Sequence, residues 1–297
     1  MSFIQDDIGV GHDIYCTTWD SLREDARYGH PHIGKLMDSG IVYCADEKYR
    51  AELEALRTQV RTILSAPFGA GDIERGEREL REALSCYARV MTADLISEIR
   101  RHAGGAVYYL ENAVALLNRT YFRRGVRHCY EELAAAEKKP ARLCERIEDV
   151  VAAKDAERLK SSLTLLVKYV ISVFEAEKAS IDQEQDGANA VPAGTYEEMF
   201  SNWHGKMRLA AETGNRHLAF MSLSGLDSML ADMSPELRDK YDAFSVYDPG
   251  NLQKTADEFD ELLEAYLSEY RAAGLTPRRY PDINAFTDDY LNVSIDN

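Results

Sequence analysis

Four arginines lie within nine residues of one another in the middle of an acidic chain: Arg119, Arg123, Arg124 and Arg127. The whole chain of 297 residues carries a formal net charge of -16 at pH 7. A local positive cluster on a negative protein predicts a bound anion, and arginine suits phosphate because its planar fork offers two donors at once. Nucleic-acid binding needs an extended basic stripe, so we predict a small phosphate compound and no nucleic acid.

Two interpretations of the arginine cluster remain open from the sequence. In the first, the arginines bind phosphate and a nearby ring, Tyr121 or Tyr130, stacks on a nucleotide base. In the second, the arginines form the outer face of a bundle helix and pair with acidic residues at helical spacing. The acidic residues close enough for that pairing are Glu131, Glu132 and Glu137.

A second group of residues that could take part in chemistry is the acidic segment at the N-terminus, which contains Asp6, Asp7 and Asp13. It leads into a run of residues that favours a strand. Carboxylates at a strand end bind Mg²⁺ through oxygen ligands, and the metal in turn holds nucleotide phosphates. We therefore predict Asp6, Asp7 and Asp13 as Mg²⁺ ligands. The alternative is that Asp6 and Asp7 are turn residues at a solvated terminus.

Two segments that must position these residues are rich in β-branched and aromatic residues. They are Ile14 to Trp19 and Ile41 to Cys44, and both predict strands. Two or three strands make an incomplete sheet with an exposed edge. The exposed edge predicts a homodimer or a strand exchange that covers it.

Beyond a Pro- and Gly-rich stretch at Ser65 to Gly76, the apolar residues follow a helical period. The strongest stripe runs from Leu159 to Phe174, and a second nearly ideal one from Thr255 to Arg271. A polar stretch from Asp182 to Gly194 separates them. The predicted fold is α+β but predominantly α-helical, with a small incomplete mixed sheet followed by helical bundles. The predicted domains are 1–66, 72–181 and 195–297.

Composition limits the classes of protein that the chain can belong to. No apolar run is long enough to span a bilayer, and the first residues lack the basic and apolar regions of a signal peptide. We therefore expect a cytoplasmic protein that does not bind a membrane. The five cysteines are widely spaced and include no Cys-x-x-Cys pair, which favours reduced thiols over disulfides or a zinc site.

The order of these elements resembles the nucleotidyltransferases of the DNA polymerase β superfamily. The likeness spans roughly Asp6 to Leu133 and is closest to small bacterial members such as the aminoglycoside nucleotidyltransferases. It rests on the acidic segment, on Gly40-Ile41-Val42-Tyr43, which looks like the strand after the catalytic sheet, and on Leu116-Leu117-Asn118-Arg119-Thr120-Tyr121-Phe122, which looks like a helix and turn facing the cleft.

The resemblance implies a reaction and a set of residues for it. A nucleoside monophosphate would pass from Mg²⁺-bound ATP, or another nucleoside triphosphate, to a small hydroxylated or amino acceptor. Asp7 and Asp13 would be catalytic carboxylates, and the nucleotide would be bound by Tyr121, Arg123, Arg124 and Arg127.

The chain departs from the family in one motif, because no Gly-Ser pair precedes its acidic segment. The sequence therefore predicts a nucleotidyltransferase-like protein with a truncated or catalytically impaired catalytic domain. The alternative is a non-enzymatic helical protein that uses the same scaffold to bind a ligand or a protein partner.

Overall fold

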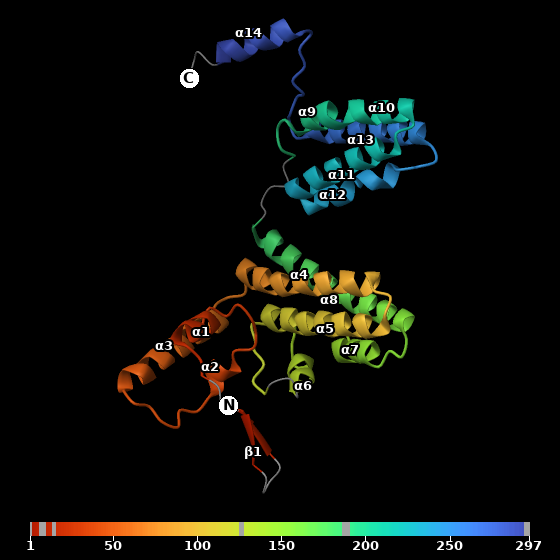
Figure 1. The fold of residues 1–297 in the computed structure, drawn as a ribbon. Coiled ribbons are helices and arrows are strands. Elements are labelled where there is room, and N and C mark those ends of the chain that lie inside the picture. The colour runs from red at the N-terminus through yellow and green to blue at the C-terminus, as the bar shows by residue number, and fades with distance from the viewer. Residues whose placement is uncertain (1, 6–9, 14–15, 125–127, 186–190, 294–297) are drawn as a thin grey trace. The chain divides into compact units, whose positions relative to one another are not determined.

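The computed structural model describes residues 2–5, 10–13, 16–124, 128–185 and 191–293, and most of these residues lie in helices (Figure 1). The chain divides into two compact units, Met1–Gln185 and Asp186–Asn297. The division falls within the polar stretch that follows the longest helix.

The first unit contains one β-hairpin and eight helices among its described residues. In chain order they are β1 (Ser2–Gln5), β2 (Val10–Asp13), α1 (Trp19–Asp25), α2 (Gly34–Asp38), α3 (Glu47–Ser65), α4 (Ala70–Thr92), α5 (Ile96–Leu117), α6 (Cys129–Ala134), α7 (Leu143–Val151) and α8 (Ala156–Gln185).

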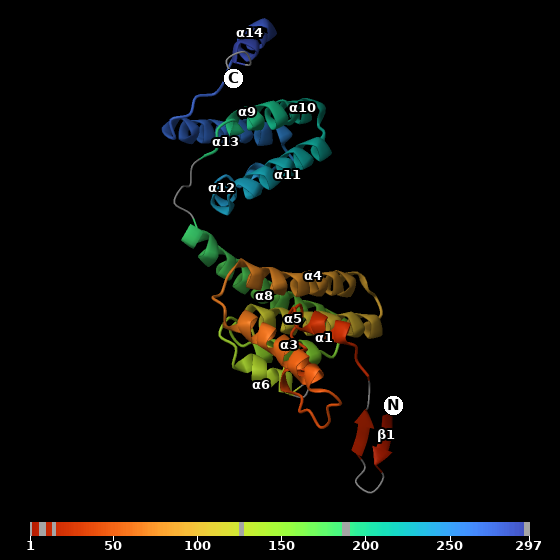
Figure 2. The same ribbon diagram turned by 90° about the vertical axis from the view of Figure 1, so that its left-hand side faces the viewer.

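A helical bundle forms the main core of the first unit. Helices α4, α5 and α8 pack side by side, and α7 packs against α8 (Figures 1 and 2). Fully buried side chains such as Leu110 on α5 and Leu163 on α8 fill the space between them. Close approach of α4 to α8 requires Gly76, because a Cβ atom there would lie 2.6 Å from the Phe174 ring. The predicted central stripe from Leu159 to Phe174 thus lies within α8.

A smaller core joins α1, α2 and α3 to the bundle. Its fully buried residues include Tyr28, Ile33 and Leu36. Leu116 and Tyr121 complete this small core although they come from the end of α5 and the segment after it. The packing of the N-terminal helices therefore fixes the position of the segment that carries the arginines.

The prediction of an α+β fold with a small mixed sheet is wrong, because the fold is helical throughout its packed parts. Within the described residues the only strands are β1 and β2, which form one antiparallel hairpin. Trp19 begins α1 rather than ending a strand, while Ile14 and Tyr15 lie outside the described residues.

The segment Ile41 to Cys44 shows why the strand prediction failed. Both flanks of this segment are fixed: Arg57 donates to the carbonyl oxygen of Ser39 at 2.5 Å, and the Asp46 side chain caps α3. Between them Val42 is 101% exposed and Tyr43 is 83% exposed. High β propensity forms a strand only where a neighbouring strand and a covered face exist, and no described segment supplies them here.

The second unit is also helical. Its elements are α9 (Thr195–Met199), the π-helix η2 (Phe200–His204), α10 (Gly205–Thr213), α11 (Arg216–Met233), α12 (Pro235–Lys240), the short 3₁₀-helix η3 (Ala243–Val246), α13 (Leu252–Ala272) and α14 (Ile283–Val293). Leu223 on α11 packs in one core with Phe259 and Tyr266 on α13. Helix α10 is capped at its C-terminus by Gly214, which has a left-handed backbone with φ of 67° that glycine adopts readily.

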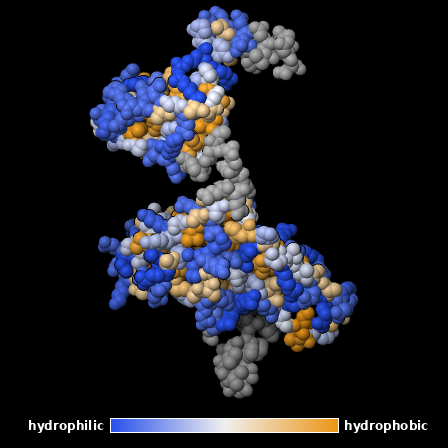
Figure 3. All heavy atoms as spheres, turned by 180° about the vertical axis from the view of Figure 1, so that it is seen from behind, coloured by the Kyte–Doolittle hydropathy of each residue, from blue (hydrophilic) through white to orange (hydrophobic). Residues whose placement is uncertain are grey.

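The surface that faces the viewer in Figure 3 is mostly hydrophilic, with hydrophobic residues in small groups on each unit. This pattern is normal for folded chains, which always expose part of their apolar atoms. Among the described helices, none combines the length and the apolar character that crossing a bilayer requires.

Candidate functional site

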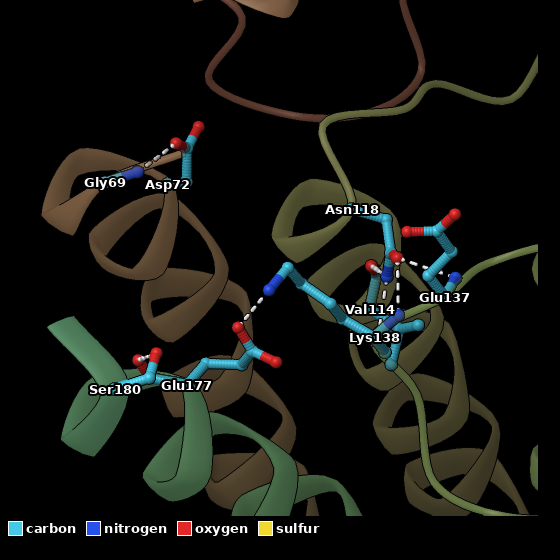
Figure 4. A network of polar contacts seen from close by, with 8 residues as sticks. All are labelled: Gly69, Asp72, Val114, Asn118, Glu137, Lys138, Glu177 and Ser180. Atoms are coloured by element: carbon cyan, nitrogen blue, oxygen red, sulfur yellow. Dashed lines mark hydrogen bonds and ion pairs between the residues drawn. The ribbon is translucent and has the colours of Figure 1, made fainter. Parts of the chain in front are cut away.

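The arginine segment begins where α5 ends, and Asn118 holds it in place (Figure 4). The Asn118 amide nitrogen donates to the carbonyl oxygens of Val114 at 2.7 Å and Lys138 at 2.8 Å. Its oxygen accepts the backbone N–H groups of Glu137 at 3.0 Å and Lys138 at 2.8 Å. All the hydrogen-bonding groups of this side chain are thereby used in fixing the turn.

Several contacts attach residues 120–123 to the N-terminal part of the unit. The Tyr28 hydroxyl donates to the carbonyl oxygen of Thr120 at 2.6 Å, and the Phe122 N–H donates to the carbonyl oxygen of Pro31 at 2.9 Å. Gly34 lies so close that a Cβ atom there would be 2.9 Å from the Phe122 carbonyl oxygen. Two segments far apart in the sequence are thus joined through their backbones.

The arginines of the cluster have different surroundings. Arg119 has a left-handed backbone with φ of 49°, and its Nη1 atom is buried without a hydrogen-bond partner in the described structure. The exposed guanidinium group of Arg123 lies 5.2 Å from the centre of the Tyr121 ring. Arg124 lies 3.5 Å from the carboxylate of Glu131. Arg127 is outside the described residues.

Two glutamates of α6 pair with groups of the arginine cluster through hydrogen bonds and an ion pair. Glu132 accepts the backbone N–H groups of Arg123 at 3.0 Å and Arg124 at 3.1 Å. Glu131 also contacts His128 at 3.0 Å. The interpretation of the arginines as partners of acidic residues therefore applies to Arg124, while Arg123 forms no ion pair with any residue that the structure describes.

Arg123 lies at a groove of about 400 Å³ between α2 and the arginine segment. The groove brings together two cationic side chains, one carboxylate, one hydroxyl and two rings. Its lining residues are His32, Gly34, Lys35, Asp38, Ser39, Phe122 and Arg123. With histidine neutral, these side chains carry a net positive charge in a chain that is otherwise acidic.

Tyr121 supports one wall of the groove. Its ring is 6% exposed, and its hydroxyl donates to the Asp38 carboxylate at 3.0 Å. Burial and the hydrogen bond to Asp38 raise the pKa of the Tyr121 hydroxyl, so it stays protonated and remains a donor. Because Tyr121 is so deeply buried, its ring offers little surface on which a nucleotide base can stack.

His32 forms another wall and is held from several sides. Its Nε2 atom lies 2.8 Å from the Asn112 side-chain oxygen, and its ring stacks on Tyr108 with centroids 5.2 Å apart. Because the Asn112 amide nitrogen donates to Glu79 at 2.9 Å, its oxygen is the acceptor and His32 is the donor. Burial lowers the pKa of His32, which favours the neutral ring.

The predicted Mg²⁺ site cannot be followed in the same detail. Asp6 and Asp7 lie outside the described residues, and Asp13 is the last residue of β2, with its side chain outside the described part. Among the described residues, no group of three or more acidic, histidine or cysteine side chains is arranged to hold a metal ion. Mg²⁺ binding by Asp6, Asp7 and Asp13 therefore stays a prediction.

The sequence interpretation missed most of the groove. The residue types alone give no reason to place His32, Asp38 and Ser39 at a binding site. No pattern in the sequence pairs residues 32–39 with residues 122–123, because backbone contacts bring them together. One usable signal was the charge at Lys35, which lies within the short Gly34–Asp38 helix.

Comparison of the chain with protein-family models, with curated proteins and with solved structures found no match in any of the three.

Proposed function

We propose that this protein binds a small phosphate-bearing compound in the groove between α2 and residues 121–123. The observation that carries the proposal is the position of Arg123, whose exposed guanidinium group lies at the groove and pairs with no carboxylate among the described residues. Stacking on Tyr121 orders the side chain before a ligand arrives, which lowers the entropy lost on binding.

The remaining groups in the groove can complete the recognition of such a ligand. Arg123 presents two parallel donors to phosphate oxygens, and Lys35 adds a second positive charge at the same groove. Ser39 offers a hydroxyl, and Asp38, held by Tyr121, can accept from a hydroxyl or amine of the ligand. A volume of about 400 Å³ suits a small compound rather than a polymer.

Transfer of a nucleoside monophosphate to a small acceptor would extend this proposal. It needs Mg²⁺ in addition to the phosphate contacts, and Asp7 and Asp13 are the predicted carboxylates. The helical architecture favours the alternative, a non-enzymatic protein that binds its ligand without turnover, because the only described sheet is the two-stranded hairpin β1–β2.

Calorimetry on the full chain tests the proposal, with inorganic phosphate and ATP as ligands, each with and without Mg²⁺. Hydrogen bonds to a charged group contribute about 1.5–3 kcal/mol, so Arg123→Gln should weaken binding by about tenfold or more. Arg124→Gln is the matched control, because Arg124 already pairs with Glu131, and we expect less than about a threefold change. Absence of binding by the unmodified protein, or equal losses in both variants, would refute the groove as the site.

The same titrations separate binding from the extended reaction. If Mg²⁺ strengthens ATP binding and ATP is cleaved to AMP and pyrophosphate, with water taking the nucleotidyl group in place of the small acceptor, the nucleotidyltransferase prediction gains support. If affinity is the same with and without Mg²⁺ and ATP stays intact, the non-enzymatic alternative holds.

A further inference from the structure

A second cavity, of about 220 Å³, lies in the first unit where the N-terminal half of α5 meets the end of α7 and the start of α8. Its lining is apolar except for one cation. The lining residues are Arg100, Ala103, Gly104, Val107, Val150, Val151, Ala153 and Leu159. The groove described above shares none of these residues.

Small side chains on α5 keep this cavity open. A Cβ atom at Gly104 would meet no other atom within 4 Å, and its neighbour Ala103 adds only a methyl group. Gly104 is exposed, so the cavity opens to the protein surface at this position. The opposite walls, Val107, Val150 and Leu159, are buried in the main core and are therefore held in place.

The rim of the cavity combines a cation with exposed apolar groups. The Arg100 guanidinium donates to the carbonyl oxygen of Lys154 at 3.3 Å, which spans from α5 to the turn before α8. Arg100 makes no ion pair within the described part of the chain. Val151, on the rim, is 60% exposed, and Ile96 lies one helical turn before Arg100 with 37% exposed.

We propose that this cavity binds the chain of an aliphatic carboxylate of medium length, with its carboxylate at Arg100. The apolar walls gain free energy by removing methylene groups from water, at about 25 cal/mol per Å². Arg100 supplies the charge complementary to a carboxylate at the position where the cavity opens. A volume of about 220 Å³ holds a chain of roughly seven water-sized groups, since each takes about 30 Å³.

Octanoate and octan-1-ol are the probes, because they share the chain and differ in the charged group. Calorimetry with the full protein should show saturable binding of octanoate and about tenfold weaker binding of octanol. Gly104→Leu should abolish binding by filling the cavity. Arg100→Gln should weaken octanoate binding by about tenfold and leave octanol binding unchanged.

Arg101→Gln is the matched control, because Arg101 is exposed and does not line the cavity. It should bind octanoate as the unmodified protein does. If Gly104→Leu fails to fold, as judged by circular dichroism, Gly104→Ala replaces it and should weaken binding by taking up part of the cavity. Lack of saturable octanoate binding, or unchanged binding in a folded cavity-filling variant, would overturn the proposal, and so would equal losses in the two arginine variants.

Discussion

The groove at Arg123 and the cavity at Arg100 lie in the same unit and are built in opposite ways. Each has an arginine at its edge that lacks a described carboxylate partner. Five of the residues that line the groove are polar or charged, and the groove depends on hydrogen bonds between segments far apart in the sequence, such as that from Phe122 to Pro31. The cavity is apolar and exists because regular helices carry small side chains at Ala103 and Gly104. An arginine thus lies at the edge of two different kinds of site. The groove at Arg123 is formed by hydrogen bonds between distant segments, and the cavity at Arg100 is formed by small side chains on a helix.

The two sites should differ most in how much the free energy of unfolding falls when a lining side chain is shortened to alanine. Leu159→Ala removes a buried wall of the cavity and should lower the free energy of unfolding by about 2–5 kcal/mol. Ser39→Ala, its counterpart in the groove, removes one hydrogen bond to Arg57 at 3.2 Å and should cost about 1 kcal/mol. Urea unfolding followed by circular dichroism measures both. Equal losses would mean that the two sites depend on the same kind of packing.

The next largest expected effect on the free energy of unfolding comes from Glu111. This residue lies on α5, after the cavity residues 100–107 and before the groove residues 122–123 in the sequence. Burial raises the pKa of Glu111 to about 7, and the carboxyl group has no hydrogen bond or ion pair to another described residue. Its stabilising contribution is complete below its ordinary pKa near 4.5 and is lost as the pH rises through 7. At pH 8, Glu111→Gln should therefore stabilise the protein by up to roughly 3 kcal/mol.

The pH dependence of that gain is the check. At pH 4.5 the free energy of unfolding of Glu111→Gln should lie within about 0.5 kcal/mol of that of the unmodified protein, because Glu111 is then neutral in the folded protein and only half ionised in the unfolded chain. Glu175→Gln, on the exposed side of α8, should change the free energy of unfolding by less than about 0.5 kcal/mol at either pH. A gain at pH 8 that persists at pH 4.5 would show that something other than ionisation is responsible.

Two glycines that line the two sites should respond to alanine with opposite signs. Gly34→Ala places a methyl group 2.9 Å from the Phe122 carbonyl oxygen and should destabilise the protein by about 1–3 kcal/mol. Gly104→Ala meets no atom within 4 Å in the middle of a helix and should stabilise it by about 0.5–1 kcal/mol. The melting temperatures of the two variants compare them directly. If both melting temperatures shifted in the same direction, the groove would not depend on close contact at Gly34, or the cavity would not depend on free space at Gly104.

The smallest expected effect is the titration of His32. Its folded pKa is lowered by burial and by nearby His30, against the raising effects of Asn112 and Glu79. The stabilising contribution of His32 is therefore present above the unfolded pKa near 6.5 and is lost as the pH falls through the folded value. NMR of the imidazole, assigned with His32→Gln, should give a pKa below 6.5. A value at or above 6.5 would mean that this wall of the groove is open to water.

Prediction from the sequence succeeded where a single helix determines the result. The apolar stripes from Leu159 to Phe174 and from Thr255 to Arg271 lie within α8 and α13, because a wide apolar face at helical period has few other ways to be buried. The Asp46 side chain caps α3, and such a cap also depends only on residues close in the sequence.

Prediction failed where the result depends on partners distant in the sequence. Ile41 to Cys44 has the residues of a strand but no neighbouring strand among those described. The arginine cluster was visible in the sequence, but the contacts that distinguish exposed Arg123 from paired Arg124 were not. The small residues at the cavity, Ala103 and Gly104, are visible in the sequence, but the helical period does not show that they lie opposite Val150 and Leu159.

Leu116 and Tyr121 come from α5 and the segment after it but are buried in the small N-terminal core, which limits where the chain can be truncated. A fragment that begins after α3 would expose both side chains, which the N-terminal helices now bury. Such a fragment would carry a new apolar patch beside the arginine segment and would tend to self-associate. The practical boundary for expressing a well-behaved piece of this protein therefore lies after α8, and the small helices belong with the bundle in any such piece.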